Sequence, residues 1–133
     1  MRIISGILKG RAINFVKNSI TRPLKDSVRE NIFNVIKHSN LIKPSIENSN
    51  ILDLYSGIGS FGIECISRGA KKVTFIEQDL NASIVLKENL NKLSIKNKSE
   101  VFNNKIESFL EGDILDKFHI FFFDPPFIDY NFV

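Results

Sequence analysis

The sequence has a single cysteine, Cys65, among its 133 residues, so an internal disulfide is excluded. It lacks any uncharged apolar run of about eighteen residues, which argues against a membrane-spanning helix. Its basic N-terminus carries only a short apolar run and no small-residue cleavage site of a secretory signal. We therefore expect a cytoplasmic protein without a membrane partner. Cys65 lies in an apolar helical pattern and is expected to be a small buried hydrophobic residue rather than a reactive thiol.

The chain also lacks internal repeats and low-complexity tracts, and no metal is expected from its pattern. At 133 residues, with 43% hydrophobic and 25% charged residues, it has the composition of one soluble globular domain. A second full domain does not fit in this length.

Negative charge is scarce in the first third of the chain. Residues 1–44 hold nine lysines and arginines against two acids, Asp26 and Glu30, whereas residues 45–133 hold nine against thirteen acids. A concentrated basic region is typical of phosphate binding, because neutralising phosphates releases counterions whatever the base sequence. A merely solvated basic surface is the alternative interpretation.

Strands and helices are predicted to alternate from about residue 50 onward. Before that point, residues 2–8 and 11–16 are β-prone runs around Lys9-Gly10, which predicts a hairpin, and a helix is expected over 24–38. The later order is strand 51–55, helix 60–68, strand 72–77, helix 80–93, strand 100–103, helix 106–112 and strand 119–124. This alternation predicts an α/β fold with a Rossmann-like, doubly wound, mostly parallel sheet in the strand order 3-2-1-4. We divide the chain into a basic hairpin-helix arm, 1–49, and a core, 50–133.

A glycine-rich loop follows the strand predicted at 51–55. Gly57 and Gly59 let the backbone turn sharply and approach a ligand, and Gly62 permits close packing of the next helix on a strand. Glu77 ends the next strand about twenty residues after Gly57, where ribose hydroxyls lie in nucleotide-binding folds. The spacing indicates a cofactor that contains a nucleoside, with a tight turn that binds nothing as the alternative.

Asp53, at the end of the same strand, separates two kinds of cofactor. Nicotinamide and flavin enzymes use such a loop to hold a pyrophosphate at a helix N-terminus. A carboxylate at Asp53 faces a dianionic pyrophosphate unfavourably but suits the α-ammonium of a methionine moiety. We therefore predict S-adenosyl-L-methionine, bound by Asp53, Gly57, Gly59 and Glu77, with a dehydrogenase as the rival interpretation.

The motif Asp124-Pro125-Pro126-Phe127 follows the last predicted strand. The two prolines end the strand and fix the backbone, so the Asp124 carboxylate and the Pro125 carbonyl point together into a cleft. This pair of acceptors suits an amino group whose lone pair is turned toward the cofactor methyl, and Phe127 suits stacking on a base swung out of its helix. A simple loop with Phe127 in the core is the alternative. The first and fourth strands are neighbours in such a sheet, so Asp53 and Asp124 are expected to share one crevice.

Together these motifs give a resemblance over essentially all 133 residues to the bacterial 16S ribosomal RNA guanine-N2 methyltransferases of the RsmD type. The opening RIISG-x-x-KGR, the run FFFDPPF and the segments ILDLYSGIGSFGIE and SRGAKKVTFIE carry it. The residues Arg22-Pro23, Asp26, Val28-Arg29-Glu30 and Phe33-Asn34 form a helix signature of that family rather than of methyltransferases at large.

The resemblance implies a class I S-adenosylmethionine methyltransferase that modifies the exocyclic N2 amine of a guanine in 16S ribosomal RNA or a small-subunit particle. It implies cofactor binding by Asp53, Gly57, Gly59 and Glu77, guanine binding by Asp124, Pro125, Pro126 and Phe127, and RNA contacts by Arg2, Arg11, Arg22 and Arg29. The alternatives are an adenine-N6 methyltransferase on DNA or RNA, and a truncated, non-catalytic chain that binds cofactor or RNA.

The sequence departs from that family in two places. Near the third strand it reads Asn103-Asn104-Lys105, where many relatives place an Asp or Asn beside adenine, so the adenine contact is left unassigned. The family normally continues for several strands beyond the Asp-Pro-Pro-Phe motif, whereas this sequence stops at Val133. We therefore expect the C-terminal strands to be missing, and the strand at 119–124 to be an exposed edge through which the chain self-associates.

Overall fold

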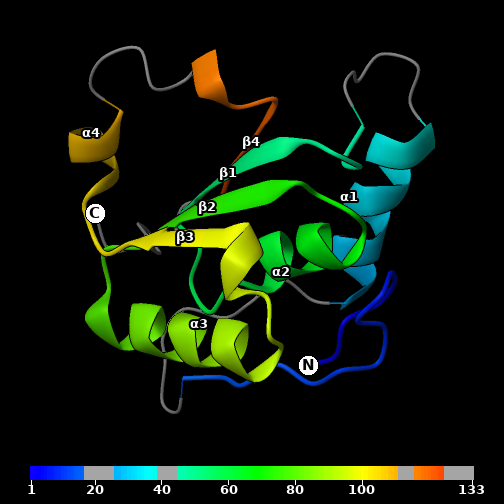
Figure 1. Cartoon of the computed structure of the whole chain (residues 1–133), viewed down its shortest axis with the longest axis horizontal. Coiled ribbons are helices and arrows are strands. Elements are labelled where there is room, and N and C mark those ends of the chain that lie inside the picture. The colour runs from blue at the N-terminus through cyan, green and yellow to red at the C-terminus, as the bar shows by residue number, and fades with distance from the viewer. Residues whose placement is uncertain (17–25, 39–44, 111–115, 125–133) are drawn as a thin grey trace, which may run out of the picture.

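The computed structural model describes residues 1–16, 26–38, 45–110 and 116–124, and Figure 1 shows how their elements are arranged. In chain order these are α1 (Asp26–His38), β1 (Asn50–Leu54), α2 (Ser60–Ser67), β2 (Lys72–Ile76), α3 (Leu80–Lys92), the 3-10 helix η1 (Lys96–Lys98), β3 (Ser99–Phe102), α4 (Ile106–Phe109) and β4 (Ile120–Phe123). The helices and strands expected from the sequence after residue 50 are therefore present, with bounds that differ by a few residues. η1 was not predicted.

The four strands form one parallel sheet in the order β3-β2-β1-β4, which confirms the Rossmann-like topology predicted from the sequence. The chain crosses over after β3, so that β4 pairs with the opposite side of β1. In the register of the two pairs, Asp53 stands opposite Phe75 of β2 and Phe122 of β4. The carboxyl ends of β1, β2 and β4 therefore meet at one edge of the sheet, where ligands bind in folds of this kind.

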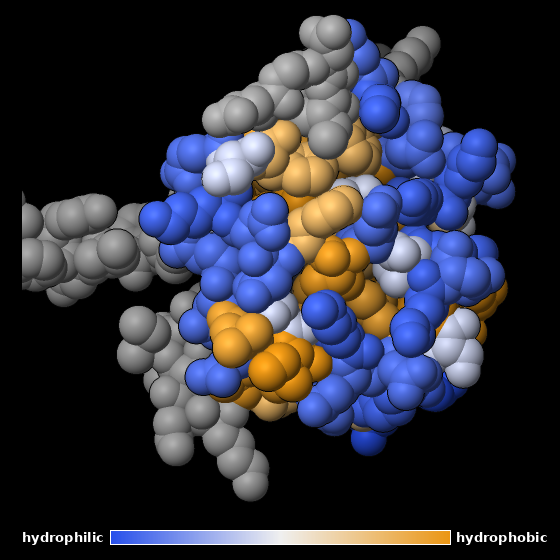
Figure 2. Space-filling model, turned by 60° about the vertical axis from the view of Figure 1, so that its left-hand side comes forward, coloured by the Kyte–Doolittle hydropathy of each residue, from blue (hydrophilic) through white to orange (hydrophobic). Residues whose placement is uncertain are grey.

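One face of the sheet is covered by few helical residues. Leu52, Leu54 and Ile76 on this face are buried together with Ile106 of α4. Farther along the same face, on β4, Phe121 is 46% exposed and Phe123 is 60% exposed. Figure 2 brings forward the left-hand side of Figure 1, where hydrophobic residues reach the surface between hydrophilic ones. The apolar cover of this face is thus incomplete among the described residues.

The other face carries the main core beneath α2 and α3, which lie on the same side of the sheet in Figure 1. Close contact between α2 and β2 depends on Gly62, because a Cβ atom at that position would lie 2.3 Å from Cε1 of Phe75. This confirms the packing role predicted for Gly62. Cys65 of α2 is fully buried in the same core, as expected, and burial raises the pKa of its thiol well above the ordinary value.

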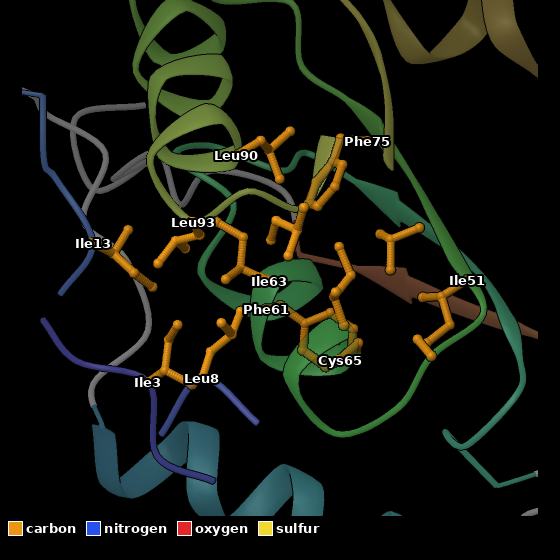
Figure 3. Close-up of a cluster of buried hydrophobic side chains, with 14 of the residues drawn as sticks. Ile3, Leu8, Ile13, Ile51, Phe61, Ile63, Cys65, Phe75, Leu90 and Leu93 are labelled. Carbon is orange, nitrogen blue, oxygen red and sulfur yellow. The ribbon is translucent and has the colours of Figure 1, made fainter. Parts of the chain in front are cut away.

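The N-terminal segment, residues 1–16, packs against this same core. Ile3, Leu8 and Ile13 are buried in one cluster with residues of α2 and α3, and Figure 3 shows their side chains pointing toward Phe61, Ile63 and Leu93. Burial of three branched aliphatic side chains gives the segment a fixed place on the sheet's covered face.

The hairpin predicted for this segment is only partly correct. The antiparallel pairing exists as one isolated bridge between Arg2 and Ala12, but residues 2–8 and 11–16 do not form strands. The turn is also wider than the Lys9-Gly10 pair, because Gly6 and Gly10 both adopt positive φ angles of 90° and 83°. Between them, the Ile7 N–H donates to the Ser67 carbonyl of α2 at 2.9 Å rather than to a partner strand.

Candidate functional site

The glycine loop connects β1 to α2 at the edge where the strands end. Gly57 and Gly59 have positive φ angles of 59° and 93°, which confirms that the loop uses the left-handed region that favours glycine. A Cβ at Gly57 would meet nothing within 4 Å, whereas one at Gly59 would lie 2.3 Å from Cδ1 of Leu86. The space beside Gly57 is therefore open, and Gly59 allows the loop to lie against α3.

Asp53 lies beneath this loop and is 1% exposed. Its Oδ2 accepts a hydrogen bond of 3.2 Å from the Gly62 N–H, and no described residue donates to its Oδ1. Burial raises the pKa of the Asp53 carboxyl well above its ordinary value. The Gly62 bond opposes this effect, and the negative charges of Glu77 and Asp124 add to it. A cationic group placed here would relieve an unfavourable buried charge.

Glu77 follows β2 and is also buried, with 9% of its surface exposed. Its two carboxylate oxygens accept the N–H groups of Gly57 at 2.7 Å and of Asp79 at 2.8 Å. The carboxylate thus ties the glycine loop to the end of β2, and each oxygen keeps a lone pair for a further donor. The Gly57 N–H, which a pyrophosphate would need, is already bonded to a carboxylate.

Asp124 comes directly after β4, and its charge raises the pKa of Asp53, so the two carboxylates lie near each other. Burial raises the pKa of Asp124 itself. The structure therefore brings together Asp53 and Asp124, as the neighbouring strand ends predicted. Pro125, Pro126 and Phe127 lie outside the described residues.

Asn103, whose role the sequence left open, joins the ends of β2 and β3. Its Nδ2 donates to the carbonyl of Glu77 at 2.8 Å and to that of Gln78 at 3.2 Å. The side chain therefore holds the backbone beside the Glu77 carboxylate.

Of the four arginines predicted to face RNA, the structure places two. Arg2 and Arg11 are exposed neighbours on the N-terminal segment, because Arg2 pairs with Ala12 and the Arg11 carbonyl accepts the Ile3 N–H at 2.9 Å. The guanidinium of Arg2 donates to the Gly10 carbonyl, and that of Arg11 to the Lys92 carbonyl. Arg22 and the side chain of Arg29 lie outside the described residues.

Sequence reasoning missed Glu64 of α2, which attaches the N-terminal segment to the core. Glu64 is fully buried, and its carboxylate accepts the N–H groups of Ile4 and Ser5 at 2.9 and 3.0 Å. It also pairs with Nε of Arg68 at 2.9 Å, and the Arg68 guanidinium stacks 4.2 Å over the ring of Phe33 in α1. The feature of the sequence that could have indicated this role of Glu64 is its place as a charged residue between the apolar Ile63 and Cys65.

Two further buried polar residues complete this attachment and were also missed. The Ser67 hydroxyl accepts the Leu8 N–H at 3.0 Å and donates to the Ser5 carbonyl at 2.6 Å. Asn89 of α3 is fully buried and bonds to both Asn14 and Ile58. Ser67 and Asn89 could have been found from the sequence, because they are polar residues at helix positions where the apolar periodicity predicts buried residues.

Two other kinds of site are absent from the described parts of the chain. No group of three or more His, Cys, Asp or Glu side chains there is arranged to hold a metal ion. None of the helices in those parts is long and apolar enough to cross a bilayer.

The parallel order β3-β2-β1-β4, the glycine loop after β1 and the carboxylates at the strand ends define a Rossmann-like, class I methyltransferase fold. A solved putative methylase from Haemophilus influenzae has this fold, with a TM-score of 0.71 and 34% identity over 98% of this chain and 66% of that one. Residues 1–133 match the family described as Conserved hypothetical protein 95, and the chain belongs to this family. The RsmD-type relationship expected from the motifs is thereby confirmed.

Curated relatives carry names that agree with this family. The putative rRNA methyltransferase YlbH of Bacillus subtilis is 36% identical over 129 residues, which are 96% of this chain and 67% of the relative. Ribosomal RNA small subunit methyltransferase D of Haemophilus influenzae is 38% identical over 129 residues, 96% of this chain and 64% of that protein. An RNA methyltransferase of Salinibacter ruber, solved with S-adenosyl-L-homocysteine, shares the fold at 18% identity and a TM-score of 0.59, covering 75% of this chain and 58% of that one. The chain thus spans about two thirds of the length of these curated relatives.

Proposed function

We propose that the chain is the S-adenosylmethionine-binding part of a methyltransferase that modifies the exocyclic N2 amine of a guanine in 16S ribosomal RNA. The names of the curated relatives support a ribosomal RNA substrate. Such a substrate would place the reaction in the cytoplasm. The guanine N2 atom comes from the resemblance to the RsmD-type enzymes.

The observation that carries the cofactor class is the buried carboxylate of Asp53, with one oxygen that accepts no hydrogen bond from the described residues. Its neighbours Glu77 and Asp124 are also negative, so the site favours a cation and disfavours a pyrophosphate. The α-ammonium of a methionine moiety fits this requirement. A nicotinamide dinucleotide does not, since the Gly57 N–H is bonded to Glu77.

The residues at the strand ends divide the proposed work between them. Asp53 would hold the α-ammonium, the open side of Gly57 would admit the ligand, and Glu77 would accept the ribose hydroxyls through its remaining lone pairs. The cofactor, when bound, supplies an electrophilic methyl group.

Asp124 is proposed to act on the target amine. It accepts a hydrogen bond from the N2 amino group, which turns the nitrogen lone pair toward the methyl group, and positioning of this kind lowers barriers by up to about 7–11 kcal/mol. Burial raises the pKa of the Asp124 carboxyl from its ordinary value. The Pro125 carbonyl and the ring of Phe127 are proposed to complete the pocket for the base, with Pro126 fixing the loop.

The RNA is proposed to bind along the basic N-terminal part of the chain, residues 1–49. Exposed Arg2 and Arg11 would contact phosphates, and Arg22 and Arg29 are proposed to extend this surface. Phosphate contacts orient a substrate without reading its sequence, so the choice of guanine rests with the site at Asp124.

Transfer of tritium from labelled S-adenosylmethionine tests this function. We expect label in 16S ribosomal RNA or in small-subunit particles, recovered as N2-methylguanine after digestion. Label in adenine-containing DNA or as N6-methyladenine would instead establish the alternative enzyme. Cofactor binding by calorimetry without any transfer would establish a non-catalytic chain, and binding of a nicotinamide dinucleotide in its place would overturn the proposal.

A further inference from the structure

One buried amide, the side chain of Asn89 in α3, joins the glycine loop to the basic N-terminal segment. Its Nδ2 donates to the Ile58 carbonyl at 3.1 Å and to the Asn14 carbonyl at 3.2 Å, and its Oδ1 accepts the Asn14 N–H at 2.8 Å. Ile58 stands between Gly57 and Gly59, in the middle of the loop. A single side chain thus bonds to both Asn14 and Ile58, which are 44 residues apart in the sequence.

The geometry requires an amide at this position. Asn89 is 0% exposed, and both of its donor hydrogens and its acceptor oxygen are used. An aspartate has no hydrogens for the two carbonyls, and a leucine of similar size leaves three backbone groups without partners. The surrounding residues of α3, such as Leu86 and Leu90, are buried and apolar, so the hydrogen bonds to Asn14 and Ile58 are what offset the cost of burying this amide.

The N-terminal segment is bonded to Asn89 through Asn14, and it also carries the exposed, positively charged Arg11. The backbone N–H and C=O of Asn14 both bond to Asn89, and the Asn14 side chain accepts from Nζ of Lys92 at 3.1 Å. Arg11, three residues earlier, donates to the Lys92 carbonyl at 3.4 Å and is exposed. Ile13 between them packs beside Leu93 (Figure 3). Release of the segment would therefore remove two of the three hydrogen bonds that orient the Asn89 amide, whose third bond goes to the Ile58 carbonyl.

We propose that Asn89 is a positioning residue through which the glycine loop and the basic N-terminal segment stabilise each other, so that cofactor binding and RNA binding are cooperative. This inference rests on the proposed function. A ligand that orders the loop would favour the docked segment, and RNA that holds the segment would favour the ordered loop. The coupling is reciprocal, so each ligand must raise the affinity of the other by the same factor.

Calorimetry on the full chain measures that factor. S-adenosyl-L-homocysteine is titrated with and without an in vitro transcript of 16S ribosomal RNA, and we expect at least about fivefold tighter binding with the RNA. In Asn89→Leu the factor is expected to fall to near one. Asn91→Leu, at an exposed position of the same helix, is the matched control and is expected to keep the wild-type factor. A wild-type factor in Asn89→Leu would overturn the inference.

Hydrogen exchange on the unmodified chain gives a second test that does not depend on a variant that folds. S-adenosyl-L-homocysteine is expected to slow exchange of the Asn14 amide several-fold, although that amide bonds only to Asn89. Unchanged Asn14 exchange at saturating ligand would also refute the coupling. If the chain binds no S-adenosyl-L-homocysteine at all, the proposed function itself fails; if both ligands bind independently, only the coupling fails.

Discussion

Asp53 occupies a buried place where its negative charge is unfavourable, and where the cationic group proposed to bind there would relieve it. Its pKa is raised by burial and by two neighbouring carboxylates, so the folded chain holds the Asp53 proton more tightly than the unfolded chain does. The stabilising contribution of the protonated group is complete below the ordinary aspartate pKa of about 3.9 and is lost as the pH rises through the raised value. At neutral pH the carboxylate is therefore expected to destabilise the chain until a cation binds.

The substitution Asp53→Asn tests this balance. Asparagine keeps an oxygen for the Gly62 N–H but carries no charge, so we expect the ligand-free chain to gain about 0.5–2 kcal/mol of stability at neutral pH. The gain should disappear in acid, where Asp53 is protonated. Cofactor affinity should fall, because the α-ammonium loses its counter-charge. Thermal denaturation at several pH values and calorimetry measure the two effects, and a less stable variant at neutral pH would contradict the expectation.

Asp124 is expected to affect transfer rather than cofactor binding. Asp124→Ala removes the acceptor proposed for the target amine, so methyl transfer should fall by at least about 100-fold, while the affinity for S-adenosyl-L-homocysteine stays within a few-fold. Asp116→Ala, which removes an exposed aspartate from the segment before β4, is the control and should leave transfer unchanged. Full activity in Asp124→Ala would remove the Asp-Pro-Pro-Phe motif from the mechanism.

At the scale of elements, the contact between α2 and β2 holds the glycine loop in register with the sheet. Gly62→Ala would place a methyl group 2.3 Å from Cε1 and 2.7 Å from Cζ of Phe75, whose ring is fully buried. We expect a loss of about 1–3 kcal/mol in the free energy of unfolding, since the packed ring cannot retreat without cost. Chemical denaturation measures this loss. A variant as stable as the wild type would show that α2 shifts freely on the sheet.

The alternation of strands and helices was predictable because it depends on patterns of neighbouring residues in the sequence. The buried strands read as short apolar runs, the positive φ angles of Gly57 and Gly59 follow from a turn that only glycine adopts easily, and the crossover rule gives the strand order. The meeting of Asp53 with Asp124 followed from the same rule, since it depends only on which strands are neighbours.

The attachment of the N-terminal segment could not be predicted in this way. Its backbone bonds to Glu64 and Asn89, which are 60 and 75 residues away from Ile4 and Asn14. Local β-propensity therefore suggested a hairpin. The structure keeps some antiparallel bonds, such as that from the Ile3 N–H to the Arg11 carbonyl, but the N–H groups of Ile4 and Asn14 donate to buried side chains of helices. A polar residue in an apolar pattern predicts that a hydrogen-bond partner exists, but it does not indicate which segment of the chain supplies that partner.

For the whole molecule, the β4 edge is the feature that follows most directly from the strand order. Among the described residues β4 pairs only with β1, and no described strand pairs with the backbone groups on its other side. The strand Ile120–Phe123 contains no charge, and Phe121 and Phe123 are 46% and 60% exposed. Uncharged, apolar edge strands of this kind pair readily with a second chain.

We therefore expect the 133-residue chain to self-associate through β4, with an apparent mass that rises with concentration in light-scattering measurements. Phe121→Lys should reduce the association, because a lysine on an edge strand opposes pairing with another strand. Ile7→Lys adds the same charge at a residue that is 77% exposed on the N-terminal segment, far from β4 in sequence, and should leave the association unchanged. If Phe121→Lys and Ile7→Lys behave alike, charge alone governs solubility and the edge is not the contact. If the chain stays monomeric at every concentration and melts cooperatively, the prediction is wrong and the four-stranded sheet is sufficient for a stable monomer.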